Sequence, residues 1–126
     1  MAGLLAGCAA PPTYEEMSKA EYGPPVKDYQ ATIRSHMETT LKDPDSAKYD
    51  FYRAPVKAYS GRPPLYGWGT CFKVNAKNSY GGYTGMQQYF VLISYDRVVK
   101  TLAGDGTNGI MDGIVAQSCA NLGPAP

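Results

Sequence analysis

Few side chains in this sequence have the types and spacing that catalysis requires. The only histidine, His36, falls on the polar side of a predicted helix, where we expect a solvated residue and not a general base. No GxSxG, HExxH or CxxC motif is present. Asp43, Asp45 and Asp50 are close in sequence, but they lack the glycine and the terminal glutamate of a calcium loop. The sequence therefore predicts no enzyme, no cofactor and no metal site.

Residues 75–85 form the densest group of asparagine, glycine and tyrosine in the chain, between two predicted strands. Glycine permits positive φ, and asparagine can bond to its own backbone, so an ordered hairpin turn is one interpretation. The other is a recognition loop whose aromatic and basic side chains contact a partner. The glycine spacing matches neither nucleotide fingerprint, which disfavours a phosphate site. The candidate binding residues are Asn75, Lys77, Asn78, Tyr80, Gly81, Gly82 and Tyr83.

A short motif, Leu-Ala-Gly-Cys, ends at Cys8 and resembles the lipobox of bacterial lipoproteins. The resemblance implies that the thiol of Cys8 carries a lipid and that residues 1–7 are the rest of a signal peptide. Small residues before the cysteine give a peptidase access to the backbone, and the thiolate is the group that is alkylated. No Lys or Arg precedes Cys8, so we expect the natural chain to begin further upstream. The alternative is a chance match in a cytoplasmic protein.

Three consequences follow from this resemblance. Residues 8–24, rich in Ala, Pro and Glu, are expected to be a lipidated flexible tether, and residues 25–126 a single globular domain. By resemblance to lipoprotein sorting, Ala9 directs the protein to the periplasmic face of the outer membrane. Cys71 and Cys119 are then an even pair in an oxidising compartment, so we predict a disulfide between them. The alternative is two buried free thiols.

An amphipathic helix is predicted over residues 26–41. Pro25 suits its first turn and Pro44 ends it. Its apolar residues recur at three and four positions, as one face of a helix requires: Val26, Tyr29, Ile33, Met37 and Leu41.

The remaining elements are mostly strands. Residues 48–59 contain a proline and indicate an edge strand or an irregular extended segment. Alternation predicts a strand over residues 66–76, and apolar β-formers predict a central strand over 86–95 that turns into 98–102. A short helix follows from residue 110. We therefore expect an α+β fold: a small antiparallel sheet of three or four strands, an N-terminal amphipathic helix packed on one face, and a short C-terminal helix.

Two segments, LKDPDSAKY at residues 41–49 and NAKNSYGGYTG at residues 75–85, resemble a pattern of small exported proteins and lipoproteins of bacteria whose role is uncharacterised. The resemblance covers about the C-terminal two thirds of the chain. It implies a shared fold and carries no activity or catalytic residue.

The net charge of +1 offers no basic face for phosphates, so we expect no nucleic acid partner. The leading hypothesis is a non-enzymatic lipoprotein that binds or supports an envelope component, either a protein or peptidoglycan. A second is an inhibitor of a cell-wall hydrolase or a phage-exclusion lipoprotein. A third is an enzyme with an unrecognised site, which is favoured if Lys77, Asp96 and Asp105 gather in one concave site and disfavoured if they are dispersed on the surface.

Overall fold

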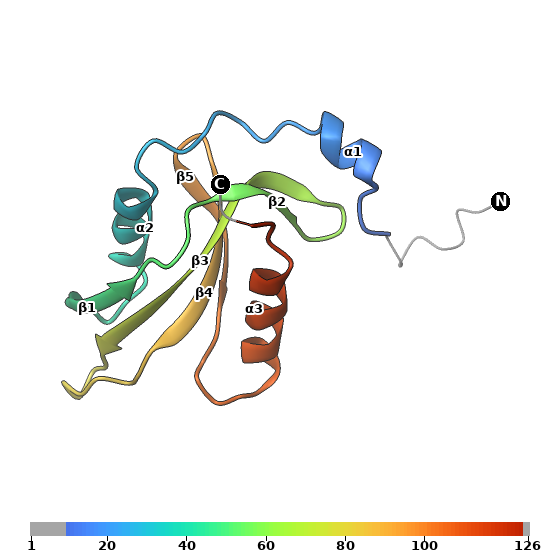
Figure 1. Ribbon diagram of the computed structural model, residues 1–126. Helices are drawn as coiled ribbons and strands as arrows, with labels where there is room; N and C mark the ends of the chain where they lie inside the picture. The colour runs from blue at the N-terminus through green and yellow to red at the C-terminus, as the bar shows by residue number, and fades with distance from the viewer. Residues whose placement is uncertain (1–9, 125–126) are drawn as a thin grey trace.

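A computed structural model describes residues 10–124 of the protein as an α+β fold (Figure 1). It contains three helices and a sheet of five antiparallel strands. In chain order the elements are α1 (Tyr14–Lys19), α2 (Tyr29–Met37), β1 (Asp43–Asp50), β2 (Val56–Ser60), β3 (Leu65–Lys77), β4 (Gln87–Ser94), β5 (Arg97–Ala103) and α3 (Ile110–Ala120).

Strand β3 is long enough to pair with two partners along one edge. The strand order in the sheet is β1-β3-β4-β5. Strand β2 also pairs with β3, along the part of β3 that lies nearer its N-terminal end. Lys57 faces Trp68 in the β2 pairing, whereas Tyr49 faces Val74 in the β1 pairing. The expected α+β class and antiparallel sheet are confirmed, but the expected three or four strands are wrong.

The error in the strand count comes from β1. Pro44 was expected to end a helix, yet it lies inside β1. Strand β1 is an edge strand with an irregular register between Asp43 and Lys48, and an edge with a bulge tolerates a residue without an N–H. The predicted extended segment 48–59 is therefore divided between the end of β1 and the separate strand β2.

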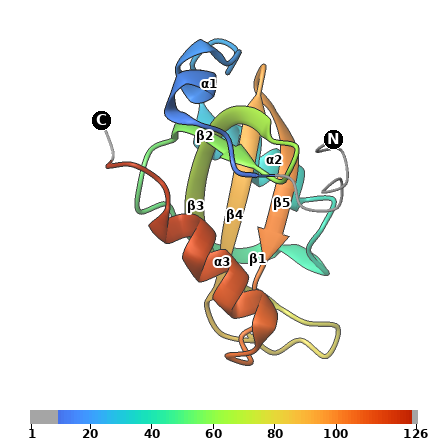
Figure 2. The same cartoon turned by 90° about the vertical axis from the view of Figure 1, so that its right-hand side faces the viewer.

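Helices α2 and α3 lie on opposite faces of the sheet (Figures 1 and 2). Neighbouring residues of β4 point to opposite faces, so this strand contributes to both cores. On the α2 side the fully buried residues include Ile33, Met37, Phe72, Val91 and Ile93. On the α3 side they are Cys71, Phe90, Leu92 and Val115.

The structure does not confirm the amphipathic helix in its predicted form. Helix α2 begins later, where the Asp28 carboxylate accepts a hydrogen bond from the Ala31 N–H at 3.1 Å, and it ends at Met37. Val26 and Leu41 lie outside the helix, half-buried against the same core. Nor is α2 the first helix, because α1 precedes it.

Part of the predicted tether, residues 8–24, is packed against the domain. Helix α1 begins with a capping box in which Thr13 and Glu16 exchange hydrogen bonds, and it has no buried residue. After it, the Tyr22 ring meets the Tyr66 ring edge-on at 5.4 Å, and the indole N–H of Trp68 donates to the carbonyl of Gly23 at 3.1 Å. These contacts hold the chain after α1 against β3.

Candidate functional site

The loop between β3 and β4 is ordered by its own asparagines. The side-chain oxygen of Asn78 accepts from the N–H groups of Tyr80 at 2.9 Å and of Gly82 at 3.2 Å. Asn75 accepts from the N–H of Gly85 at 3.0 Å. Gly81 and Gly85 have positive φ, of 83° and 95°. The loop therefore has a defined backbone without support from the core.

Within this loop the two candidate tyrosines have different environments. The Tyr83 hydroxyl donates to the carbonyl of Ser46 at 3.1 Å, which fastens the ring across β1. The ammonium groups of Lys48 and Lys77 lie 4.7 Å and 5.6 Å from the centre of the Tyr83 ring, within cation–π range. Tyr80 is 96% exposed. The structure thus brings Lys77 and Tyr83 together and leaves Tyr80 as a projecting side chain.

A small cleft of about 170 Å³ lies beneath the start of this loop. No carboxylate of the described part of the chain lines it, and Lys77 and Asn78 belong both to the cleft and to the loop or its start. Burial raises the pKa of Tyr89, which keeps its phenol protonated. The polar side chains around the cleft are Thr40, Lys42, Lys77, Asn78, Thr84, Gln87 and Tyr89. Lys42 and Lys77 are cations, and the other groups can both donate and accept hydrogen bonds, so the cleft suits an anionic or hydroxyl-bearing group.

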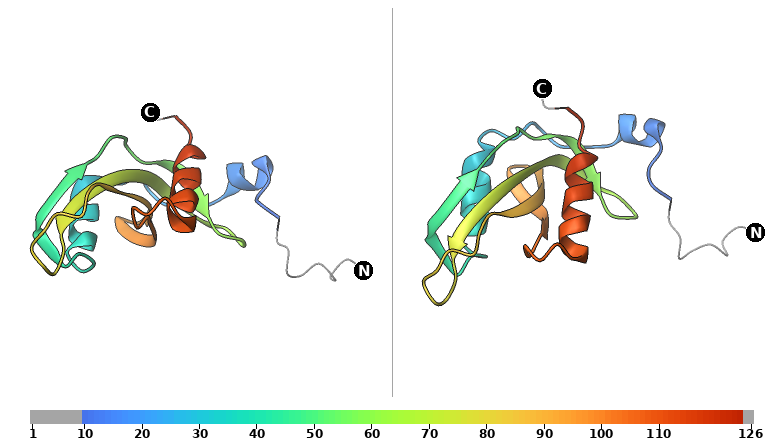
Figure 3. Two further views of the ribbon diagram at one scale, coloured as in Figure 1. Left: turned by 90° about the horizontal axis from the view of Figure 1, so that it is seen from below. Right: turned by 60° about the horizontal axis from the view of Figure 1, so that its bottom comes forward.

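The loop lies far from α1. Figure 3 shows it projecting from the end of the sheet, on the side away from that helix. Because β1 pairs antiparallel with β3, the start of β1 lies beside the end of β3, where the loop begins. The segment that follows α2 leads into the start of β1 and so reaches the same end of the sheet.

The other candidate residues do not form a shared site. His36 was expected to be solvated, but its Nε2 lies 3.0 Å from the Thr101 hydroxyl, and the half-buried ring bridges α2 and β5. Asp96, in the β4–β5 turn, accepts from the Lys27 N–H at 3.0 Å. Asp105 lies in the β5–α3 loop. Neither of these aspartates lines the cleft that Lys77 lines, so the three residues named for an enzyme are not gathered there.

Among residues 10–124 no group of three or more histidine, cysteine, aspartate or glutamate side chains is placed to hold a metal ion. Asp43 is the first residue of β1. Its carbonyl accepts from the Ser46 hydroxyl at 2.7 Å, and this contact shapes the irregular part of the strand.

The predicted disulfide between Cys71 and Cys119 is confirmed, with a Cα–Cα distance of 5.9 Å, and the free-thiol alternative is wrong. It joins β3 to the last turn of α3. Cys8, the proposed lipid attachment site, lies outside the described residues.

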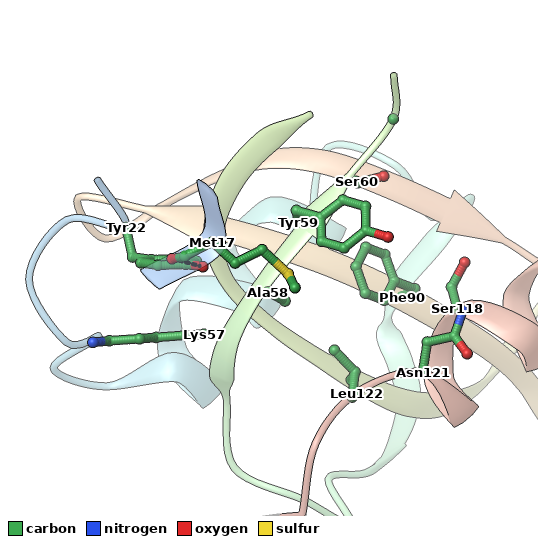
Figure 4. Close-up of a pocket in the computed structure, with 11 residues that line it drawn as sticks. Met17, Tyr22, Lys57, Ala58, Tyr59, Ser60, Phe90, Ser118, Asn121 and Leu122 are labelled. Carbon is green, nitrogen blue, oxygen red and sulfur yellow. Dashed lines mark hydrogen bonds between the residues drawn. The ribbon is translucent and has the colours of Figure 1, made fainter. Parts of the chain in front are cut away.

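Sequence reasoning missed a second and larger cavity, of about 540 Å³, between α1, β2 and the end of α3 (Figure 4). Its walls come from segments that are distant in the sequence, such as Met17, Tyr59 and Leu122. The only sequence signal near it was the edge-strand interpretation of residues 48–59.

No protein-family model, curated protein or solved structure matches this chain. None of the helices in residues 10–124 combines the length and apolar character needed to cross a bilayer.

Proposed function

We propose that this protein is a non-enzymatic binding module of the bacterial envelope, anchored to the periplasmic face of the outer membrane through lipid on Cys8. It contacts peptidoglycan with the β3–β4 loop. The observation that carries this proposal is the ordered loop: Asn75 and Asn78 hold its backbone, Tyr80 projects, and two lysine ammonium groups lie close to the Tyr83 ring.

The chemistry of this loop suits a glycan that carries peptides. A tyrosine ring offers an apolar face to a sugar ring, while its hydroxyl stays hydrated. Lys42 and Lys77 line the cleft beside the loop and can meet carboxylates of the peptide stems. The only ion pair among residues 10–124 joins Lys19 to Glu15, so these lysines have no competing carboxylate within 4.0 Å. Because the loop is fixed before binding, little ordering entropy opposes association.

The position of the loop supports the same function. An anchor at Cys8 is followed by five residues before α1 begins at Tyr14, a span of at most about 18 Å when extended. The loop lies at the opposite end of the domain from α1 (Figure 3). A protein held at its α1 end would therefore present the loop away from the membrane, toward the cell wall.

The anchor is tested by expressing the gene with its upstream region in a Gram-negative host and comparing it with Cys8→Ser. We expect the intact mass of the wild type to include the lipid, and both this mass and the membrane association to be lost in the variant. An unprocessed N-terminus on a protein that stays in the cytoplasm would refute the anchor.

Binding is tested by co-sedimentation of the full chain with purified peptidoglycan sacculi. Truncating a central aromatic contact costs more than about 1 kcal/mol, so Tyr80→Ala should weaken binding roughly fivefold or more. Tyr14→Ala, at an 83% exposed tyrosine of α1, is the matched control and should leave binding unchanged. Equal sedimentation of all three proteins, or none by the wild type, contradicts the proposal.

The fixed backbone of the loop also favours a second candidate, an inhibitor whose loop enters the cleft of a cell-wall hydrolase or of an incoming phage protein. Rigid loops of this kind bind without paying for their own ordering. The two candidates differ in a lytic assay: an inhibitor slows a wall hydrolase acting on a soluble wall fragment, whereas a wall-binding module protects only the intact polymer.

A further inference from the structure

The cavity at β2 follows the edge of a strand. Five consecutive residues, Lys57 to Gly61, line it, and the first four belong to β2. Successive side chains of a strand point to opposite faces of the sheet, so a cavity on one face contacts only every second residue. A cavity that contacts consecutive residues must therefore extend along the edge of the strand. We call this cavity the β2 groove. Figure 4 shows β2 passing between Met17 and Tyr22 on one side and Ser118 and Asn121 on the other.

The outer edge of β2 has unused backbone groups. Within residues 10–124, strand β2 pairs with β3 alone, through Val56 to Ser60. No other backbone or side-chain hydrogen bond among residues 10–124 involves these five residues. Free N–H and C=O groups on a sheet edge are a template for another strand. The groove thus combines an unpaired edge with the space beside it.

The walls of the groove define which side chains it accepts. Leu122 and Ala58, both half-buried, provide an apolar surface that packs on the buried Phe90. Ser60, Ser118 and Asn121 provide hydrogen-bonding groups around it. The volume of about 540 Å³ is in the range of sites that enclose a ligand of a few residues.

The charge that lines the groove is positive only. Among the described residues, Lys57 is the only charged one that lines it, and its ammonium lies 5.5 Å from the centre of the Tyr22 ring. No carboxylate lines the groove, and none lies within 4.0 Å of Lys57 in residues 10–124. The complement of this wall is a ligand that carries a carboxylate.

We propose that the β2 groove binds an extended peptide that adds as a strand to the free edge of β2. An apolar side chain of the peptide lies against Ala58 and Leu122, and a carboxylate meets Lys57. Main-chain hydrogen bonds supply affinity, and these two contacts supply specificity. The site is separate from the β3–β4 loop and does not depend on the function proposed for it.

The test uses the full chain with its disulfide formed and a series of fluorescent nine-residue peptides of alternating leucine and threonine. A single glutamate is moved along the series. We expect saturable binding that is strongest for one glutamate position, with protection from hydrogen exchange confined to β2 amides. Methylating alternate peptide nitrogens should abolish binding in one of the two registers only, because a strand presents alternate N–H groups to its neighbour.

Two variants address the groove itself. Ser118→Trp fills it and should abolish binding, whereas Ala116→Trp, an exposed position of the same helix outside the groove, should not. Lys57→Gln should lower the affinity for the glutamate peptide about tenfold and leave the affinity for an all-neutral peptide unchanged. Unfolding midpoints of the variants distinguish a filled groove from a misfolded domain.

The proposal is overturned if no peptide of the series binds, if Ser118→Trp binds as the wild type does, or if the protected amides lie in the β3–β4 loop. The first two outcomes do not bear on sacculus binding through Tyr80, and the third would assign the peptide to the β3–β4 loop instead. Failure of the groove proposal is therefore distinguishable from failure of the proposed function.

Discussion

The disulfide is predicted to hold a large share of the stability of this domain. Cys71 and Cys119 are 48 residues apart, and closing a loop of that length lowers the entropy of the unfolded chain by an amount worth about 4 kcal/mol at 25 °C. A domain of this size has a net stability of roughly 5–15 kcal/mol. Loss of the bond should therefore lower the unfolding midpoint by roughly 15–30 °C.

The structure also predicts where the loss acts first. Helix α3 has one buried residue, Val115, and its N-cap, Gly109, forms no side-chain cap hydrogen bond. Helix α3 is also attached to the sheet covalently, through the disulfide from Cys119 to the fully buried Cys71 of β3. Once the bond is broken, α3 should open before β4 does.

Two forms of the protein distinguish the stability that comes from the covalent link from the stability that comes from packing of the sulfur atoms. Both are made in a Cys8→Ser background that prevents thiol exchange. Reduction keeps the sulfur atoms, whereas Cys71→Ala with Cys119→Ala removes them from the core. Urea unfolding measures the free energy, and hydrogen exchange compares α3 with β4. A loss below about 1 kcal/mol on reduction, with unchanged protection of α3, would refute this reasoning.

Two further predictions concern glycines and a carboxylate. A Cβ on Gly69 would lie 2.7 Å from the Cβ of Ala58 and 3.1 Å from Leu122, so Gly69→Ala should destabilise the protein by about 1–3 kcal/mol in urea unfolding. Nothing lies within 4 Å of the corresponding position of Gly113, so Gly113→Ala in α3 should instead stabilise it by about 0.5–1 kcal/mol; a reversed order would contradict the packing described above. Hydrogen bonds from the Thr107 hydroxyl and N–H lower the pKa of Asp105 below its ordinary 3.8. A lowered pKa stabilises the fold above the ordinary value and this effect is lost as the pH falls through the folded value, so the difference in unfolding midpoint between wild type and Asp105→Asn should be present at neutral pH and vanish in acid; a difference that grows in acid would show the opposite sign.

Strands β3, β4 and β5 were predictable because their signals are local. Alternation along residues 66–76 and the apolar stretch after residue 86 reflect which side chains each face buries. Strand β1 was not predictable, since Pro44 after a helical pattern has the local signature of a helix end. Only its position at the sheet edge, next to the end of β3, makes an extended conformation favourable there.

Helix α2 illustrates the same division. Periodicity identified Ile33 and Met37 as buried, yet it also included Val26 and Leu41, which pack against the core from outside the helix. Apolar spacing records which residues meet the core and does not record where the hydrogen-bonded helix begins and ends.

By itself, the sequence determined the α+β class, the disulfide partners and an asparagine- and glycine-rich loop that orders itself. Each of these depends on residue identity or on contacts between near neighbours in the chain. The tertiary structure decided the rest: that Lys48 and Lys77 lie close to the Tyr83 ring, and that Met17, Lys57, Phe90 and Leu122 line one groove. These residues belong to separate elements, and strand pairing and helix packing bring them together through contacts that no local pattern encodes.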